Sequence, residues 1–332
     1  MRIVMAAVDG VFDSGLSAIM DVLGAANSLS ARDGGAPPFS MTVVGGEPQV
    51  RTGNGLSLAT VPVGELPHGT DLLLMPAVGF QAPDRVVAAV REPANAWLLD
   101  LAAASAAAGT PLAAACSGAF FLAESGTLER KRATTSWWLG PAFRARYPGV
   151  VLEDSRTLIQ DGPVTTAGAA FAHIDLALWA VQRYSPALAA LVARYLLIGD
   201  RPSQAAFALP TQLAQADPLM AAFERWARAH LADPPPLAEA ARTLGVSQRT
   251  LQRTAQTVLG RSPLDFVQDI RLDEATFLLR TTTLSAEAIA GRVGYRNVST
   301  LRELVRRRRG SSLETLRHGG ADAPAQSPPL SS

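Results

Sequence analysis

The stretch PLAEAARTLGVSQRTLQRTAQTVLGRSPLDF, residues 236–266, recurs in pattern as TLSAEAIAGRVGYRNVSTLRELVRRRRGSSLETLR, residues 283–317. The segment GRSPLDF at the end of the first copy returns as GSSLETL in the second. The chain therefore contains one structural unit twice. Three pairs of equivalent residues, 49 or 50 positions apart, define the alignment: Gly245 and Gly294, Leu251 and Leu301, Gly260 and Gly310.

Each copy predicts two helices joined by a tight turn. In the first copy, Ala240, Ala241 and Leu244 form one side of a short helix, with small residues where a second helix must cross closely. Gly245 takes a positive φ at low cost and so can end that helix. Ser247 is a good N-cap for the helix that follows. The second copy repeats this arrangement, which indicates two helix-turn-helix units.

The second helix of each unit is the candidate recognition helix, expected over about residues 247–258 and 298–308. In the first unit one side of this helix is apolar at Leu251 and Ala255, and the other side is rich in Gln and Arg. A polar helix behind a short glycine-containing turn suits insertion into the major groove of DNA. A single alanine-rich helix pair is usually plain packing, but two copies at this spacing favour DNA binding.

The expected DNA contacts follow from the geometry of base edges. Arg pairs well with guanine and Gln with adenine, so we expect Gln248, Arg249 and Gln252 to read bases. Arg253 and the run Arg306 to Arg309 are expected to contact phosphate or to cap the helix, although a four-arginine run is often only a solvated face. The base-contact candidates of the second unit are Asn297, Ser299, Thr300 and Arg302.

The duplicated pattern resembles the DNA-binding domain of AraC/XylS transcription factors, which carries two helix-turn-helix units of about this length and linkage. The resemblance covers roughly residues 217–317. The second unit departs from the family pattern at three positions. Leu301 and Val305 stand where the family usually has aromatic residues, and Glu303 stands where a basic residue is common.

The composition divides the chain into two parts of opposite charge. A length of 332 residues suggests two domains. The net charge is only +1, but residues 217–318 contain 16 Arg against 11 Asp and Glu, whereas residues 1–216 carry 14 basic and 17 acidic residues. The basic part is the part with the repeat, as expected for a nucleic-acid-binding module.

The sequence gives three indications about the compartment. The single cysteine, Cys116, excludes an internal disulfide. The segment MRIVMAAVDGVF has an aspartate within its first ten residues and no long apolar core, so no signal peptide is expected. No uncharged apolar run reaches the ~20 residues that a membrane helix needs. We therefore expect a cytoplasmic protein with no membrane contact, no cofactor and no metal.

The first part of the chain alternates between strand-like and helix-like segments. This alternation predicts an α/β domain with a doubly wound, mainly parallel, flavodoxin-like sheet and helices on both faces, followed by the all-α double helix-turn-helix domain. Residues 57–63 are a candidate edge strand and residues 169–184 a closing amphipathic helix. The buried-strand candidates are residues 2–8, 39–46, 70–77 and 110–118.

The expected domain boundaries follow from composition. The first domain is expected over residues 1–184, and residues 185–216 are expected to be a linker with Pro, Ser and Gln and few large apolar side chains. The DNA-binding domain is expected over residues 217–318. Residues 319–332 consist mainly of Gly, Ala, Pro and Ser and are expected to be a disordered tail.

Cys116 lies between an apolar strand and a helix, in AAACSGAF. A side chain at such a sharp turn points up from the sheet, as in a nucleophile elbow. The N-terminus of the following helix would lower the pKa of the thiol and favour a thiolate. The alternative is a small buried hydrophobe, as most free cysteines are.

Residues 1–184 resemble the ThiJ/PfpI type of class I amidotransferase-like domain. The resemblance makes Cys116 the elbow cysteine, Asp21 the acidic residue that approaches it, and Ser136 the residue at a position where regulator relatives often carry a histidine. None of the histidines stands where enzyme members have one, and His173 is expected to be packed or on the surface. A cysteine nucleophile needs a proton-transfer partner. We therefore expect a vestigial pocket without catalysis that binds a small-molecule effector.

The order of the two domains resembles that of GlxA-like regulators of the AraC family. This resemblance implies a sequence-specific transcriptional regulator that binds double-stranded promoter DNA, with a first domain that forms a homodimer or senses an effector. Two alternatives stay open. One is a cysteine-dependent hydrolase or glyoxalase-like lyase, and the other is a DNA-binding switch that responds to oxidation of Cys116.

Overall fold

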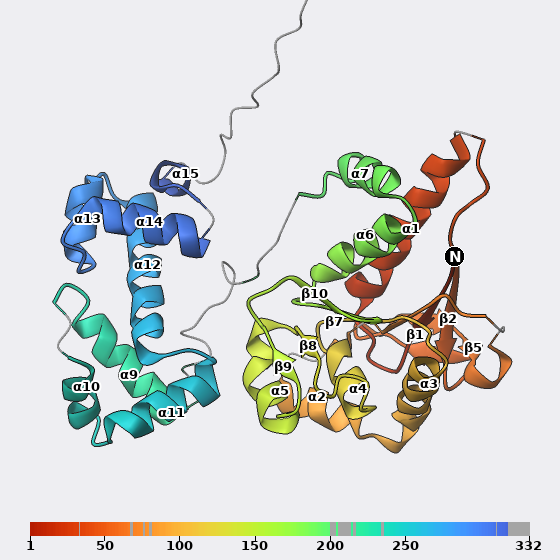
Figure 1. Cartoon of the computed structure of the whole chain (residues 1–332), viewed down its shortest axis with the longest axis horizontal. Coiled ribbons are helices and arrows are strands. Elements are labelled where there is room, and N and C mark those ends of the chain that lie inside the picture. Colours follow the sequence, from red (N-terminus) through yellow and green to blue (C-terminus); the bar gives the residue numbers. More distant parts are fainter. Residues whose placement is uncertain are drawn as a thin grey trace, which may run out of the picture. The chain divides into compact units, whose positions relative to one another are not determined.

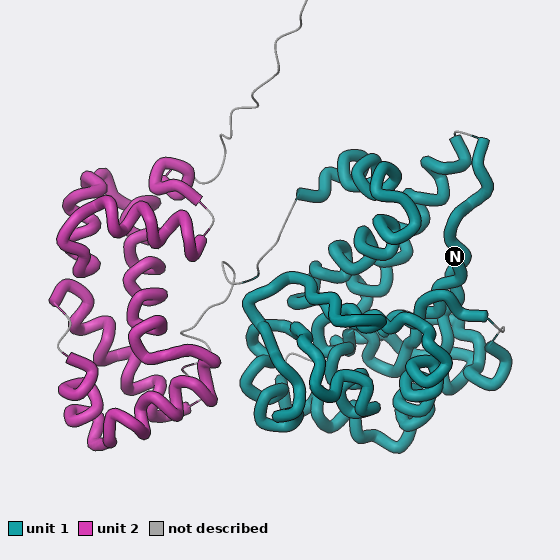
Figure 2. Tube along the Cα trace, in the orientation of Figure 1, with its two compact units in different colours: residues 1–205 teal, residues 206–332 magenta. Residues whose placement is uncertain are grey.

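The computed structural model divides the chain into two compact units, residues 1–205 and 206–332 (Figure 2). Gly310, His68, His318, residues 200–203, 205–213 and 215–216 of the expected linker, and the expected tail lie outside the described residues. The structure describes residues 1–32, 34–66, 69–75, 77–79, 82–199, 204, 214, 217–233, 236–309 and 311–317.

The first unit is built on a seven-stranded sheet with the order β10-β11-β7-β6-β1-β2-β5. All neighbouring strands are parallel except β10 and β11. When the five parallel strands β1, β2, β6, β7 and β11 are numbered in chain order, their order across the sheet is 2-1-3-4-5, as in flavodoxin-like folds. The strands are β1 (Arg2–Ala6), β2 (Ser40–Gly45), β5 (Val61–Pro62), β6 (Leu72–Met75), β7 (Leu112–Ala115), β10 (Leu158–Asp161) and β11 (Val164–Ala167).

Helices cover both faces of this sheet (Figure 1). Side chains alternate along each strand, so Ile3 and Met5 of β1 pack under α1, α6 and α7, whereas Val4 and Ala6 pack under α2 to α5. The expected doubly wound fold is therefore confirmed. The helices are α1 (Asp13–Arg32), α2 (Pro83–Val90), α3 (Ala96–Ala107), α4 (Gly118–Glu124), α5 (Gly140–Arg146), α6 (Ala172–Tyr184) and α7 (Pro186–Tyr195).

Two sequence expectations for this unit need revision. The edge strand expected over residues 57–63 is divided, because β4 (Ser57–Ala59) pairs with β3 (Gln49–Arg51) while β5 joins the main sheet. Residues 186–195 of the linker expected over residues 185–216 form α7, which packs in the core of the first unit. Its Ala189 and Val192 are buried there, which removes residues 186–195 from any linker.

The described part of the second unit is all helical, and α12 joins its two lobes (Figure 1). Helices α9 to α11 precede α12 and helices α13 to α15 follow it. Ser247 caps α11 and Ser262 caps α12, each by accepting a hydrogen bond from a backbone N–H. The helices are α9 (Pro218–Ala229), α10 (Leu237–Thr243), α11 (Gln248–Leu259), α12 (Pro263–Thr281), α13 (Ala286–Arg292), α14 (Val298–Arg309) and α15 (Leu313–Arg317).

The two helix-turn-helix turns pass through glycines in the left-handed region. Gly245 has a φ of 70° and Gly294 a φ of 81°. A Cβ at Gly245 would meet no atom within 4 Å, whereas a Cβ at Gly294 would collide with the carbonyl oxygen of Leu231 and the guanidinium of Arg271. Both turns need glycine for its φ, but only the second also needs it for space. None of the helices that the structure describes is long and apolar enough to cross a membrane.

We predict that Gly294→Ala destabilises the second unit more than Gly245→Ala does. The left-handed conformation alone should cost about 1–2 kcal/mol in each variant. Gly294→Ala should cost several times as much, because backbone has to move to relieve the collision. Urea unfolding of both full-length variants, followed by circular dichroism and compared with the unmodified protein, measures the difference. Equal losses would contradict the close approach at Gly294.

Candidate nucleic-acid interface and cysteine site

Helix α11 presents a polar face made only of neutral and basic side chains. Gln248, Arg249, Gln252 and Arg253 are all exposed, and the helix contains no acidic residue. The opposite side of the helix is buried at Leu251, Ala255 and Leu259. The structure therefore brings the expected contact residues of the first helix-turn-helix unit together on one accessible side of a single helix.

Helix α14 carries the expected contact residues of the second unit. Ser299, Thr300, Arg302 and Arg306 are exposed. Asn297 precedes the helix, and its Oδ1 accepts hydrogen bonds from the backbone N–H and the hydroxyl of Thr300, both at 2.9 Å. Asn297 thus caps α14 by accepting from Thr300, a role that was not expected for these residues. Their part in base contact stays a prediction.

The expectation for the four-arginine run is wrong for its last two members. Arg308 donates hydrogen bonds to Asp265 at 2.5 Å and to Asp269 at 3.0 Å, and Arg309 pairs with Asp273. All three carboxylates belong to α12. Arg308 and Arg309 therefore hold α14 against α12, which leaves the exposed Arg306 and Arg307 as the phosphate-contact candidates of this run.

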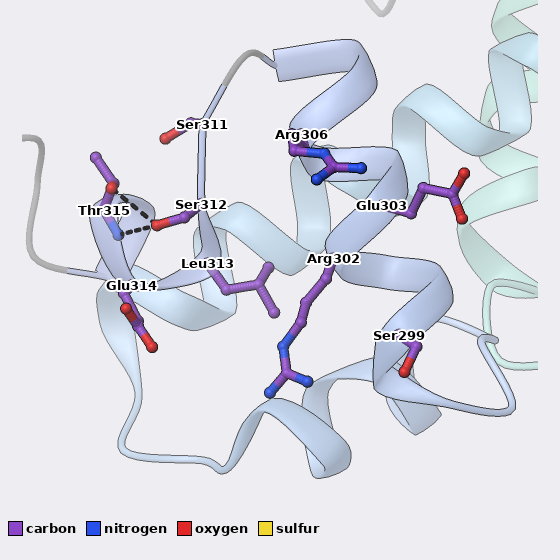
Figure 3. A pocket seen from close by; sticks show the side chains of 9 residues that line it. All are labelled: Ser299, Arg302, Glu303, Arg306, Ser311, Ser312, Leu313, Glu314 and Thr315. Carbon is purple, nitrogen blue, oxygen red and sulfur yellow. Dashed lines mark hydrogen bonds between the residues drawn. The ribbon is translucent and has the colours of Figure 1, made fainter.

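A groove of about 610 Å³ lies between α14 and the turn that begins α15 (Figure 3). Arg302 and Arg306 line it, together with Glu303 and Glu314. Arg302 extends toward the α15 side, whereas Glu303 points away from it (Figure 3). The recognition helix of the second helix-turn-helix unit thus presents a surface of mixed charge, in contrast to α11 of the first helix-turn-helix unit. The remaining lining residues are Ser299, Ser311, Ser312, Leu313 and Thr315.

Cys116 forms the sharp turn between β7 and α4 in the compact unit of residues 1–205. Its φ is +54°, in the left-handed region that non-glycine residues rarely adopt. Its N–H donates a hydrogen bond to the carbonyl of Ala167 at 3.0 Å, and Thr135 Oγ1 donates to the carbonyl of Cys116 at 2.7 Å. The turn expected from the sequence is therefore present and is held by both of its backbone polar groups.

The expected thiolate is not supported by the surroundings of Cys116. Burial raises the pKa of the thiol, and hydrogen bonds with Ser136 and Ser117 offset only part of that effect. Cys116 Sγ and Ser136 Oγ lie 2.7 Å apart, so these two residues of the expected pocket are in contact. The sequence expectation that the helix N-terminus would lower this pKa is wrong, because only 5% of the residue is exposed and desolvation dominates.

Asp21 does not join this site. It lies on the exposed side of α1, while Ile19, Val22 and Leu23 form the buried side. A residue two positions from Ile19 points in a different direction on a helix of 3.6 residues per turn. The expectation that Asp21 is the acidic partner of Cys116 is therefore wrong.

His173 is a buried residue at the start of α6. It is 0% exposed, its Nε2 accepts a hydrogen bond from the N–H of Ala77 at 3.2 Å, and its Nδ1 donates to the carbonyl of Ala170. Burial lowers the pKa of this imidazole to about 4. A Cβ at Gly15 would lie 2.7 Å from Nε2, so the glycine in α1 makes room for the ring. His173 is packed, in agreement with one of the two expected placements.

Gln204 is a functional candidate that the sequence did not reveal. It lies within the expected linker, yet it is only 4% exposed. Its Nε2 donates to the carbonyl of Thr135 at 2.8 Å, and its Oε1 accepts from the N–H of Ala169 at 3.0 Å. Thr135 is the residue that bonds the carbonyl of Cys116. Gln204 thus packs against the loop that supports the cysteine turn.

The comparisons with known proteins concern both units. Residues 240–319 match a family model described as a helix-turn-helix domain. The HTH-type transcriptional regulator CdhR of Pseudomonas aeruginosa is 30% identical over 195 residues, which are 58% of this chain and 58% of CdhR. The regulator GlxA of Rhizobium meliloti is 28% identical over 191 residues, 54% of this chain and 56% of GlxA. The match spans little more than half the length of these two relatives.

Two solved structures also match part of this chain. A crystal structure of an AraC family transcriptional regulator from Pseudomonas putida has 22% identity and a TM-score of 0.49, and the match covers 59% of this chain and 98% of that one. A ThiJ/PfpI family protein from Pseudomonas syringae has 19% identity and a TM-score of 0.48, with 60% and 76% covered.

Residues 240–319 of this chain are thus a helix-turn-helix domain. The resemblance of the chain to HTH-type transcriptional regulators such as GlxA is confirmed by these relatives.

We predict that His173 makes the first unit less stable in mild acid. Between pH 6.5 and about 4 the unfolded chain binds a proton on this imidazole that the folded chain excludes. The free energy of unfolding therefore keeps its full value above about pH 6.5. It decreases as the pH falls toward 4, by roughly 3 kcal/mol at most. Urea unfolding at several pH values, compared with His173→Gln, isolates this contribution. Parallel profiles for the two proteins would contradict it.

Proposed function

We propose that this protein is a transcriptional regulator that binds double-stranded DNA in a sequence-specific manner. The observation that carries the proposal is the duplicated helix-turn-helix unit, in which α11 and α14 each bury one side and present a polar side. Two such helices suit successive major-groove segments about one DNA turn, or ~34 Å, apart. The relatives named above are HTH-type transcriptional regulators, which supports the same function.

Within this proposal, Arg249 and Arg253 have different tasks. Both are exposed on α11, one helical turn apart, and both are basic. Arg249 lies in the first turn of the helix, where recognition helices approach base edges, and we assign it to a guanine. Arg253 lies farther along the helix and is assigned to phosphate. The two residues therefore form a matched pair for separating base contacts from backbone contacts.

We predict that Arg249→Ala relaxes sequence preference and costs roughly 1–3 kcal/mol on the specific duplex alone. Arg253→Ala should instead weaken specific and scrambled duplexes equally and reduce the salt dependence of binding. Fluorescence anisotropy of the full-length protein on its upstream intergenic DNA and on scrambled duplex, across a salt series, measures both effects. Equal weakening of the two duplexes by Arg249→Ala would refute the base contact. Absence of binding at low salt by the unmodified protein would refute the proposed function.

We further propose that the first unit is not catalytic and serves to bind an effector or to form a homodimer. The thiol of Cys116 is buried and neutral, and Asp21 lies on the exposed side of α1. A nucleophilic cysteine needs an activated thiolate and a proton-transfer partner. The same burial disfavours oxidation of Cys116 as a signal, since sensor cysteines are accessible thiolates. A cytoplasmic location is part of this proposal.

We predict that Cys116 reacts slowly with thiol reagents. Burial and the raised pKa of the thiol should make its reaction with Ellman's reagent at pH 7 roughly tenfold or more slower than in the urea-unfolded protein. The time course of absorbance measures the rate, and Cys116→Ser gives the background. Rapid stoichiometric reaction of the folded protein would contradict the neutral buried thiol and would reopen the enzymatic and redox interpretations.

A further inference from the structure

Asp269 is a buried carboxylate near the middle of α12. It is 5% exposed, and each of its two oxygens accepts a hydrogen bond from a different arginine. Arg261 donates to Oδ2, and Arg308 donates to Oδ1 at 3.0 Å. A buried carboxylate between two guanidinium groups is well matched in charge and hydrogen bonding.

The two arginines come from the C-terminal ends of the two recognition helices. Arg261 follows Gly260, the left-handed residue that ends α11, and its Nε donates to the carbonyl of Leu259 at 3.3 Å. Arg308 lies in the last turn of α14. One carboxylate on α12 thus holds the ends of both α11 and α14.

We infer that Asp269 is a positioning residue that fixes the distance and angle between the two recognition helices. This inference rests on the proposed function. Two helices on one DNA molecule bind strongly only when their separation matches the spacing of the two half-elements. A linkage that is already rigid in the free protein lowers the ordering cost of binding. Asp269 therefore confers preference for one half-element spacing, in addition to the sequence preference of each helix.

The folding of the second lobe does not rest on Asp269. The second lobe has its own apolar core, in which Leu279 of α12 packs with Ile289, Leu301 and Val305. That core does not depend on Asp269. Loss of the charge should therefore leave α14 folded and change chiefly its relation to α11.

Asp273 provides a matched control. It lies one helical turn farther along α12 and pairs with Arg309 of α14. It therefore ties α12 to one recognition helix, whereas Asp269 ties it to both. Asp269→Asn and Asp273→Asn each remove one carboxylate charge from the same helix with almost no change in shape.

The test uses the full-length protein and a duplex that the unmodified protein selects from a random library. Variants of this duplex carry insertions of two and five base pairs between the half-elements, or only one half-element. We expect Asp269→Asn to lose roughly tenfold in affinity for the selected duplex and to lose most of its discrimination against the inserted duplexes. Its affinity for a single half-element should stay unchanged. Asp273→Asn should keep the spacing preference of the unmodified protein.

The outcomes separate this inference from the proposed function. If the unmodified protein selects no sequence, the proposed function fails and the role of Asp269 fails with it. If it selects a bipartite sequence and Asp269→Asn keeps the same spacing preference, or if both variants weaken on every duplex in equal proportion, only the inference is overturned. If Asp269→Asn does not fold, Arg261→Gln carries the same expectation, because it releases α11 and leaves the contact between Asp269 and Arg308.

Discussion

Helix α12 supplies apolar surface to both helix-turn-helix units, and both recognition helices depend on this shared burial. Phe266 near its start packs against Phe223 of α9, with ring centres 5.9 Å apart, and Leu279 near its end packs in the core of the second lobe. A unit of about 40 residues seldom buries enough surface to fold alone. Each buried Leu or Phe contributes about 1.5–3 kcal/mol, whereas the net contribution of a buried ion pair is small because desolvation offsets much of its attraction. Apolar burial therefore provides the stability, and the ion pairs along α12 determine how the recognition helices are held.

The cysteine turn of the first unit shows a similar competition between two effects. The helix that follows Cys116 is only seven residues long, and a helix N-terminus stabilises a nearby anion by about 0.3–1 kcal/mol at an exposed site. Full burial shifts a pKa by up to about 3–5 units in the opposite direction, and one unit is about 1.4 kcal/mol. Burial is thus the larger effect, and the thiol stays neutral. A strand-to-helix turn creates a nucleophile only if the turn is also open and polar.

The spacing of apolar residues along the sequence predicted the strands of the sheet and the accessible side of α11. The alternation along β1 and the apolar stripe of α11 each repeat within a few residues, so the fold and the accessible side of α11 could be inferred. The direction of Asp21 was available in the same way, since Ile19, Val22 and Leu23 already define the inner side of α1. The partners of Arg308 and Gln204 could not be inferred. Arg308 bonds carboxylates 39 and 43 residues away, and Gln204 bonds mainly backbone groups, which leave no signature in the sequence.

The two helix-turn-helix units have diverged in how they use arginine. In α11 the arginines at 249 and 253 are exposed, and the helix has no acidic residue. In α14 the arginines at 308 and 309 bond α12, and Glu303 lies exposed on the helix. Helix α14 nevertheless presents Arg302, Arg306 and Arg307 as exposed cations. Because exposed cations supply most of the affinity for phosphate, the two helices offer a similar net positive charge once Glu303 is counted. The second unit adds a fixed geometry: its Arg308 and Arg309 are held by carboxylates of α12, so they are not available to a phosphate but keep α14 against α12.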